Sequence, residues 1–220
     1  MCVRPTRIKR MTTKLSKFLA IVTIGMSGTT GGAVADAIKF DFKDPKGVNN
    51  AVFKLDAPLE AISGNANGIS GTVSYDPAKP DSIRGRIVVD ATTLHVPNPT
   101  MKQHMQGEQW MNIAKHPEVT FEVTSVKSAY AAGDSASLEV VGALVMHGVT
   151  NQIVAPVKLN YLPGKLADRT NGQMKGDLLV LRSTFKVKRS DYGINPKAPS
   201  DKVADEVEIS LSVAGSAPKQ

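Results

Sequence analysis

The sequence predicts an all-β protein, an antiparallel β-barrel of about eight strands with one short helix between strands. Three observations carry this prediction. Apolar residues recur at every second position through most of the chain after residue 36, which is typical of strands that bury one face. Gly, Pro, Asn and Asp separate these segments, and only one stretch has helical spacing. Because nearly every strand has one apolar and one polar face, a closed barrel, which leaves no unpaired edge, fits better than an open sandwich.

The clearest strand pattern is a predicted β-hairpin at residues 138–159. Even-numbered apolar residues run from Leu138 to Met146, and odd-numbered ones run from Ile153 to Leu159. The segment His147-Gly148-Val149 separates the two runs, and Gly148 can adopt a positive φ at little cost. We expect the other strands to pair with this hairpin.

The remaining elements follow from the same alternation. The only good helix candidate is residues 100–111, with Thr100 as N-cap, and residues 163–173 are predicted to be a loop. The barrel domain is expected to span residues 36–215, followed by a disordered tail at 216–220. Further strands are predicted at residues 38–42, 51–57, 69–75, 83–89, 119–123, 179–187 and 207–213, with a weaker one at 62–66.

Residues 1–35 have the three parts of a secretory signal peptide. Six basic residues and no acid precede or overlap an apolar run at 18–26, and Ala33-Val34-Ala35 forms an A-x-A cleavage site. The apolar run is shorter than the ~20 residues that a spanning helix needs. We therefore expect cleavage after Ala35 and a periplasmic or secreted protein, with an uncleaved N-terminal anchor as the alternative.

Removing this segment changes the charge balance. Of 27 basic and 20 acidic residues, the first 35 hold six basic ones, which leaves 21 against 20. The near-neutral remainder argues against a nucleic-acid partner. The only cysteine, Cys2, lies in the segment to be removed, so no disulfide and no thiol chemistry are expected.

Four segments resemble signatures of the YceI-like family, in order and with similar spacing. The hairpin at 141–150, VGALVMHGVT, is similar to G-x-L-T-x-H-G-V-T. Residues 71–77, GTVSYDP, resemble the family's G-x-i-x-f-D-P strand end. Residues 104–121, with HM, WM and HPEVTF, resemble its H-L…F-F…y-P-x-i-x-F block. Residues 185–194, FKVKRSDYGI, resemble F-x-i-x-R-x-D-F-G-I, so the likeness covers about residues 38–213.

The resemblance implies a lipocalin-like barrel in the periplasm that holds a polyisoprenoid or another lipid in a long apolar tunnel. It implies no other cofactor. The chain departs from the family pattern at Asn49-Asn50, where the family has His-Ser, and at residues 55–58, LDAP, where it has V-x-H. If the apolar strand faces and the Met/Trp-rich helix region line one barrel, we expect the ligand to contact Phe53, Leu55, Ile87, Val89, Met105, Trp110, Phe121, Val123, Leu144, Met146, Val157, Leu159, Leu181 and Phe185.

The histidines allow two interpretations, a metal site and a simpler structural role. His104 and Glu108 lie four residues apart on the predicted helix, and with His116 or His147 they offer a weak zinc motif. We favour a hydrogen bond from His104 that holds the helix to the barrel, so no metal is predicted.

No catalytic residue is predicted either. Ser190-Asp191 has no histidine nearby in the sequence, and G-x-S-x-G is absent. Lys186, Lys188 and Arg189 form a short basic run, which we interpret as a solvent-exposed strand face, with a docking patch for a lipid phosphate as the alternative.

The sequence therefore favours an exported binding protein that carries or stores a long apolar molecule, and not an enzyme. The alternatives are an enzyme or stress-response factor acting on an envelope lipid, and an interaction domain whose barrel is packed solid. A membrane-spanning segment is not predicted. The oligomeric state stays open, with a dimer as one option.

Overall fold

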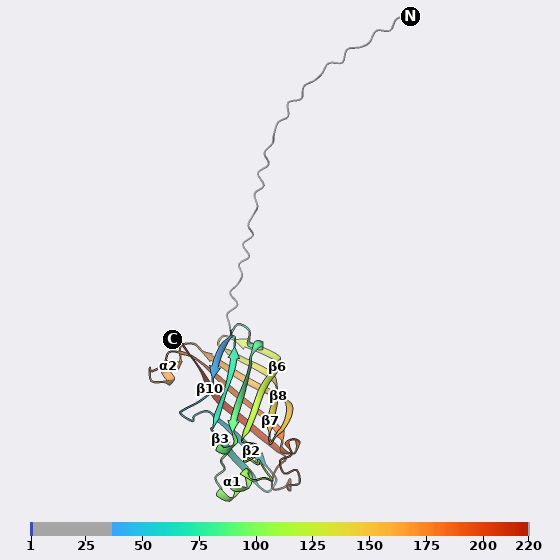
Figure 1. Cartoon of the computed structure of the whole chain (residues 1–220). Helices are drawn as coiled ribbons and strands as arrows, with labels where there is room; N and C mark the ends of the chain where they lie inside the picture. Colours follow the sequence, from blue (N-terminus) through green and yellow to red (C-terminus); the bar gives the residue numbers. More distant parts are fainter. Residues whose placement is uncertain (2–36, 220) are drawn as a thin grey trace. The chain divides into compact units, whose positions relative to one another are not determined.

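The computed structural model describes Met1 and residues 37–219 (Figure 1). The predicted signal peptide lies, apart from Met1, outside the described residues. The described chain holds ten strand segments, two short α-helices and three 3-10 turns. These are β1 (Ile38–Asp41), β2 (Asn50–Asp56), β3 (Ala61–Ala66), β4 (Ile69–Tyr75), η1 (Pro80–Ser82), β5 (Arg84–Asp90), η2 (Ala91–Thr93), α1 (Pro99–Gln106), β6 (Glu118–Ala132), β7 (Ser135–Met146), β8 (Val149–Leu162), α2 (Leu166–Arg169), β9 (Gly176–Lys188), η3 (Arg189–Tyr192) and β10 (Glu206–Pro218).

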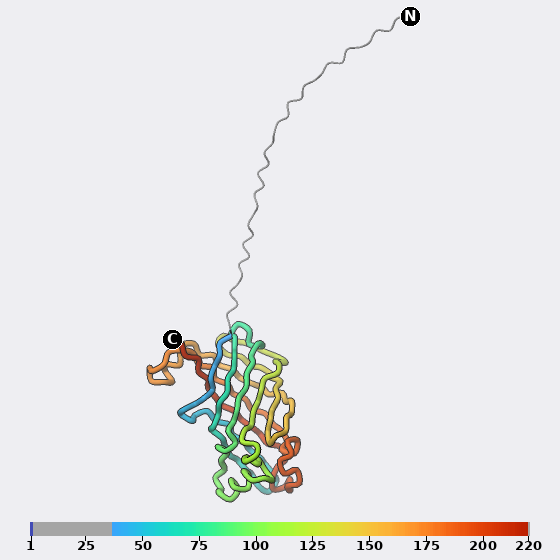
Figure 2. The backbone as a smooth tube through the Cα atoms, viewed as in Figure 1, coloured from blue at the N-terminus to red at the C-terminus, as the bar shows by residue number. Residues whose placement is uncertain are grey.

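The ten segments occupy eight positions in one closed antiparallel sheet. β1 pairs with β10 at Ser216, and β2 pairs with residues 208–212 of β10, so β1 and β2 are two halves of one strand. The loop at 42–49, which bulges from the side of the barrel, separates the halves (Figure 2). β4 and β3 pair with β1 and β2 respectively, so they too continue one another, across Asn67-Gly68. The predicted eight-stranded antiparallel barrel is confirmed.

The predicted central hairpin is β7 and β8. Met146 pairs with Val149, which leaves His147 and Gly148 as a two-residue turn with φ values of 53° and 77°. Two positive φ values match the twist of the flanking strands, and Gly148 adopts its value without a steric cost. The even-numbered side chains of β7 from Leu138 to Met146 are buried, as the alternation predicts.

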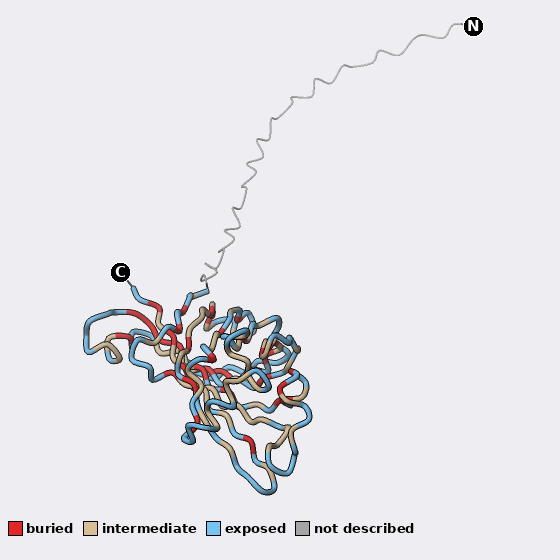
Figure 3. The backbone as a smooth tube through the Cα atoms, turned by 60° about the horizontal axis from the view of Figure 1, so that its bottom comes forward, coloured by how far each residue is buried: buried red, intermediate tan, exposed pale blue. Residues whose placement is uncertain are grey.

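The barrel has a solid half and a hollow half. The solid half lies at the end with α2 and the C-terminus. There the fully buried side chains of Phe40, Phe42, Leu159 and Leu179 belong to one hydrophobic cluster. Buried positions gather along the strands inside the barrel and give way to half-buried and exposed ones in the loops (Figure 3). The hollow half lies at the end with α1, between β2, β3 and β10.

Two predictions about irregular segments are wrong. Residues 216–218 belong to β10: Ser216 and Ala217 pair with Leu178 and Asp177 of β9, because Gly215 and Ala217 continue the inward-facing side of the strand. Within the predicted loop at 163–173, residues 166–169 form the single turn α2, so the barrel carries more than one helix. In the described residues, no helix is long and apolar enough to cross a membrane.

The predicted helix at 100–111 is present as α1, but it begins and ends at other residues than predicted. The N-cap of α1 is Asn98, whose side-chain oxygen accepts a hydrogen bond of 3.0 Å from the N–H of Met101. Pro99 occupies the first helical position, where its missing N–H costs nothing. Thr100 therefore lies inside the helix. The helix ends at Gln106 because Gly107 adopts extended backbone angles.

Candidate ligand-binding cavity

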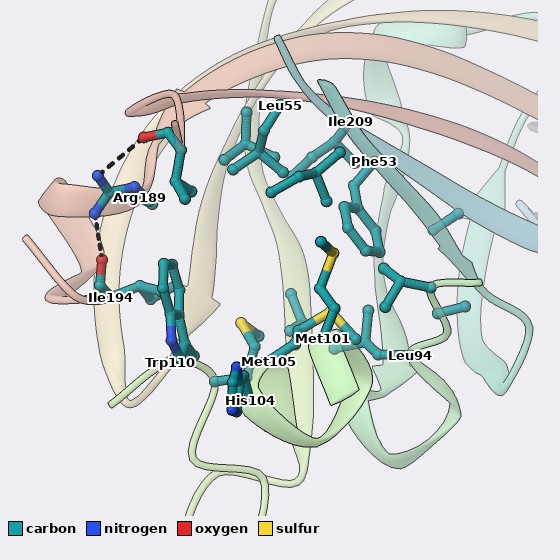
Figure 4. Close-up of a pocket in the computed structure, with 18 of the residues that line it drawn as sticks. Phe53, Leu55, Leu94, Met101, His104, Met105, Trp110, Arg189, Ile194 and Ile209 are labelled. Atoms are coloured by element: carbon teal, nitrogen blue, oxygen red, sulfur yellow. Dashed lines mark hydrogen bonds between the residues drawn. The ribbon is translucent and has the colours of Figure 1, made fainter. Parts of the chain in front are cut away.

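An apolar cavity of about 470 Å³ fills the hollow end of the barrel. Its volume lies within the ~300–1,000 Å³ range of small-molecule pockets. β2 and β3 form one wall, β10 a second, and α1 with the segment after it a third (Figure 4). Six residues expected to contact the ligand line it: Phe53, Leu55, Val89, Met105, Trp110 and Met146.

A second cavity of about 110 Å³ lies deeper in the barrel. It shares Ala51, Val89, Val119 and Ile209 with the wall of the outer cavity, so the two adjoin. Gly142 of β7 lets the Phe121 ring pack against the backbone, since a Cβ there would lie 2.3 Å from the ring. Eight expected residues line this inner cavity: Ile87, Val89, Phe121, Val123, Leu144, Val157, Leu181 and Phe185.

Leu159 is the exception among the expected residues. It is fully buried in the solid half and lines neither cavity, because its strand position lies beyond the depth that the cavities reach. The apolar alternation identified its inward direction correctly and could not identify its depth. Contact of the other residues with a ligand stays a prediction.

Helix α1 covers the outer cavity without being part of the core. Met101 and Met105 are half-buried and line the cavity, and no residue of α1 is fully buried. In Figure 4, Met101 lies on the side of the cavity with Leu94, below Phe53 and Ile209, and Met105 lies between Met101 and Trp110. Methionine is flexible and polarizable, so this lid can adapt to an irregular apolar ligand.

Arg189 lies in the cavity wall, although its side chain is only 3% exposed. A guanidinium has five N–H donors, and here carbonyl groups of the following loop accept all five. Nε donates to Ala204 at 3.2 Å, Nη1 to Ile194 at 3.0 Å and to Asn195, and Nη2 to Ala198 and Val203, each at 3.3 Å.

Burial of Arg189 corrects the interpretation of the basic run. Lys186 and Lys188 are exposed as expected, and Lys186 pairs with Glu206 at 2.8 Å. Arg189 instead follows Val187 in the series of odd-numbered residues of β9 that face the barrel interior. Its odd number in this series could have predicted its burial. Its guanidinium carbon lies 5.9 Å from the centre of the Trp110 ring.

The outer rim of the cavity carries polar side chains that the apolar alternation did not identify. Glu60, Asn98, Thr100 and His104 are exposed and line the cavity. They come from the turn before β3 and from α1 with its cap. The sequence placed Thr100 and His104 on the predicted helix and gave Glu60 no role, and only barrel closure brings these residues together.

The histidines are not arranged as a metal site among the described residues. His116 and His147 stack edge to face with ring centres 5.2 Å apart, while His104 lies on α1 in the cavity wall. Partial burial lowers the pKa of His116, and the nearby charges of His147 and Lys115 lower it further. No group of three or more His, Cys, Asp or Glu side chains is close enough to hold an ion in this part of the chain.

Two details of the histidine prediction change. Glu108 lies beyond the end of α1, so it shares no helical face with His104. The His104 imidazole makes no hydrogen bond with the described residues, so the expected bond to the barrel is absent. His147 does make one: its Nδ1 lies 3.0 Å from the carbonyl of Tyr192, which can only accept, so Nδ1 carries the proton.

Polar groups close the opposite end of the barrel. Asp177 is fully buried, and its carboxylate accepts hydrogen bonds from Tyr161 Oη (2.8 Å), the N–H of Gly164 (2.9 Å) and Lys219 Nζ (2.9 Å). Burial alone would raise the pKa of Asp177, but these donors outweigh it and hold the pKa below its usual value. Burial, and to a smaller extent the hydrogen bond to Asp177, raise the pKa of Tyr161 to about 12.

Asn49 strengthens this closed end. It is buried, its Nδ2 donates to the carbonyls of Phe42 and Ala214, and its Oδ1 accepts from the N–H of Ala214. It thereby joins the broken strand β1–β2 to β10. The departure from the family pattern at Asn49-Asn50 consequently lies at the closed end of the barrel, away from the outer cavity.

The fold and the cavity define a class: a closed antiparallel barrel with an apolar interior that ends blind at one end. A family model described as a YceI-like domain matches residues 44–214, and the chain belongs to this family. A UPF0312 protein of Pseudomonas aeruginosa is 28% identical over 91% of this chain and 98% of the relative. One of Yersinia pestis is 26% identical over 91% of this chain and 97% of the relative.

Solved structures share the fold at low identity. Burkholderia cenocepacia BcnA has a TM-score of 0.62 and 18% identity, and covers 76% of this chain and 95% of its own. A polyisoprenoid binding domain from Saccharophagus degradans, implicated in plant cell wall breakdown, has a TM-score of 0.59 and 12% identity, and covers 83% and 99%.

Proposed function

We propose that this chain is an exported binding protein that carries or stores a long apolar molecule, a polyisoprenoid or another lipid, inside its barrel. The observation that carries the proposal is the pair of adjoining cavities, whose walls are mostly apolar between the polar outer rim and the inner end. A linear chain suits this shape, because its tail can enter the inner cavity while the rest fills the outer one.

The energetics favour such a ligand. Each buried CH₂ group contributes ~0.8 kcal/mol, so several isoprene units can bind with few polar contacts. Ordering the chain offsets part of this gain. The Saccharophagus relative, whose described role is polyisoprenoid binding, supports the same ligand class here. The A-x-A site in the sequence supports export.

A binding role also fits the chemistry of the cavity better than catalysis does. The titratable or charged groups in its wall are Glu60 and His104 on the rim and Arg189, which the loop carbonyls saturate. No nucleophile with a hydrogen-bonded base lies beside them among the described residues.

Solvent extraction of the purified protein followed by mass spectrometry tests the proposal directly. We expect an apolar chain in the wild-type extract. Val123→Trp, in the wall of the inner cavity, should reduce its amount severalfold by filling that space. Thr124→Trp, on the exposed face of the same strand, is the matched control and should retain it. Empty extracts from both the wild type and the control would contradict the proposal.

A further inference from the structure

The cavity wall has an uneven distribution of charge. Its inner part is apolar, and the polar groups of its outer part lie on the rim, where Glu60 carries a negative charge. Arg189 is the only Lys or Arg side chain in the wall within the described part of the chain. Within the cavity wall, the charged end of an anionic lipid could therefore pair only with Arg189.

Arg189 has no donor left for a ligand. Its five N–H groups already point to five backbone carbonyls, and the whole side chain is 3% exposed. A phosphate that displaced these carbonyls would release the loop that contributes Ile194 and Val203 to the wall. The neighbouring Lys186 is paired with Glu206.

The rim groups suit a different kind of head. The Asn98 side chain uses its oxygen to cap α1, which leaves its amide N–H₂ as a donor. The Thr100 hydroxyl and the His104 imidazole each donate or accept. A hydroxyl or carbonyl head group satisfies such partners, whereas a diphosphate would face the Glu60 carboxylate with no free Lys or Arg among the described residues that line the cavity.

We propose that the cavity selects apolar chains with an uncharged, hydrogen-bonding head, such as an alcohol or a quinone, and discriminates against phosphate and diphosphate heads. Glu60 is the specificity-determining residue: it repels an anion at the rim. The tail occupies the inner cavity, and the head lies beside Asn98, Thr100 and His104. This inference rests on the proposed function, since it concerns the ligand of the same cavity.

Two probes of equal chain length test the inference. Geranylgeraniol and geranylgeranyl diphosphate share one hydrocarbon tail and differ only in the head. Each is titrated, below its micelle-forming concentration, into delipidated protein. The readout is the fluorescence of Trp110, the single tryptophan of the chain, which lies in the cavity wall. We expect the alcohol to bind at least about tenfold more tightly.

A charge reversal at the rim isolates the role of Glu60. Glu60→Lys should tighten binding of the diphosphate about fivefold and change binding of the alcohol less than about twofold. Glu108→Lys makes the same charge change just after α1, at an exposed residue that does not line the cavity, and should leave both affinities nearly unchanged.

The outcomes separate this inference from the proposed function. If both probes bind and the diphosphate binds as tightly as the alcohol, the head-group selection is wrong while lipid binding stands. Equal responses of Glu60→Lys and Glu108→Lys would also overturn it. If neither probe binds and extracts of the purified protein are empty, both proposals fail.

Discussion

Replacing Arg189 tests whether one buried guanidinium holds the mouth of the cavity in shape. Arg189→Met keeps an apolar stem and removes all five hydrogen bonds to the loop at 194–204. Four of the five carbonyls belong to half-buried residues, so water can replace the lost donor there. The carbonyl of Ile194, a buried residue, is the exception.

The expected cost follows from this exposure. Where water can reach the freed carbonyl, losing a hydrogen bond costs only its net contribution to stability, ~0.5–1.5 kcal/mol. Removing the buried charge also removes the penalty for its desolvation, which offsets part of this loss. We therefore expect Arg189→Met to lower the free energy of unfolding by about 2–4 kcal/mol. Arg189→Lys should also be destabilising, because an ammonium has three donors in place of five and is more strongly hydrated.

Urea unfolding followed by circular dichroism measures this change as a shift in midpoint at constant slope. The control is Lys188→Met, which changes an exposed neighbour and should lie within about 0.5 kcal/mol of wild type. Ligand retention should fall in Arg189→Met and stay unchanged in the control, since the Arg189 side chain bonds to the carbonyls of Ile194 and Val203 in the wall and the Lys188 side chain makes no such bond among the described residues. Equal midpoints for the two variants would refute the reasoning.

Three further predictions concern the closed end, the metal question and export. Asp177→Asn should cost about 1–3 kcal/mol in urea unfolding, because it replaces a charged acceptor of three donors. The folded pKa of Asp177 lies below its unfolded value near 3.8, so its contribution is complete above that pH and is lost as the pH falls through the folded pKa. Acid titration should therefore destabilise the wild type more than the variant, and parallel curves would count against this. His104→Ala should change stability by less than about 1 kcal/mol, because its imidazole is exposed, and should release no stoichiometric ion. Elemental analysis that finds one zinc per chain, lost in the variant, would contradict it. The intact mass of exported protein should match residues 36–220, and a mass that includes residues 1–35 would exclude cleavage after Ala35.

The strands were predictable because alternation is a local property. Side chains of a strand point to opposite faces at every second residue, so β7 and β8 reveal their buried faces without any knowledge of their partners. Where a strand ends is harder to predict when its inward residues are small. Gly215 and Ala217 continue the buried face of β10, yet their composition resembles that of a polar tail.

The site was predictable on its apolar side and much less so on its polar side. Alternation along a strand shows which side chains point into the barrel, but not how far along the barrel axis each one lies. Leu159 points inward as expected, yet it lies in the solid half and not at a cavity. Charge misled the interpretation of Arg189, since its partners are backbone carbonyls that carry no signal in the sequence. The rim joins Glu60 to Asn98 and His104 across more than thirty intervening residues.

The buried Asp177 network would give exchange of the proposed ligand a direction. Because that end of the barrel is sealed, the proposed chain-like guest would enter tail first and leave head first, past α1. Every CH₂ group that moves from the apolar wall into water during departure raises the barrier by up to ~0.8 kcal/mol, so residence time should lengthen steeply with chain length. An acceptor that docked at the α1 end would meet the head group first and could draw out the tail without exposing it to water. Release would then be fast in the presence of such an acceptor and slow in its absence.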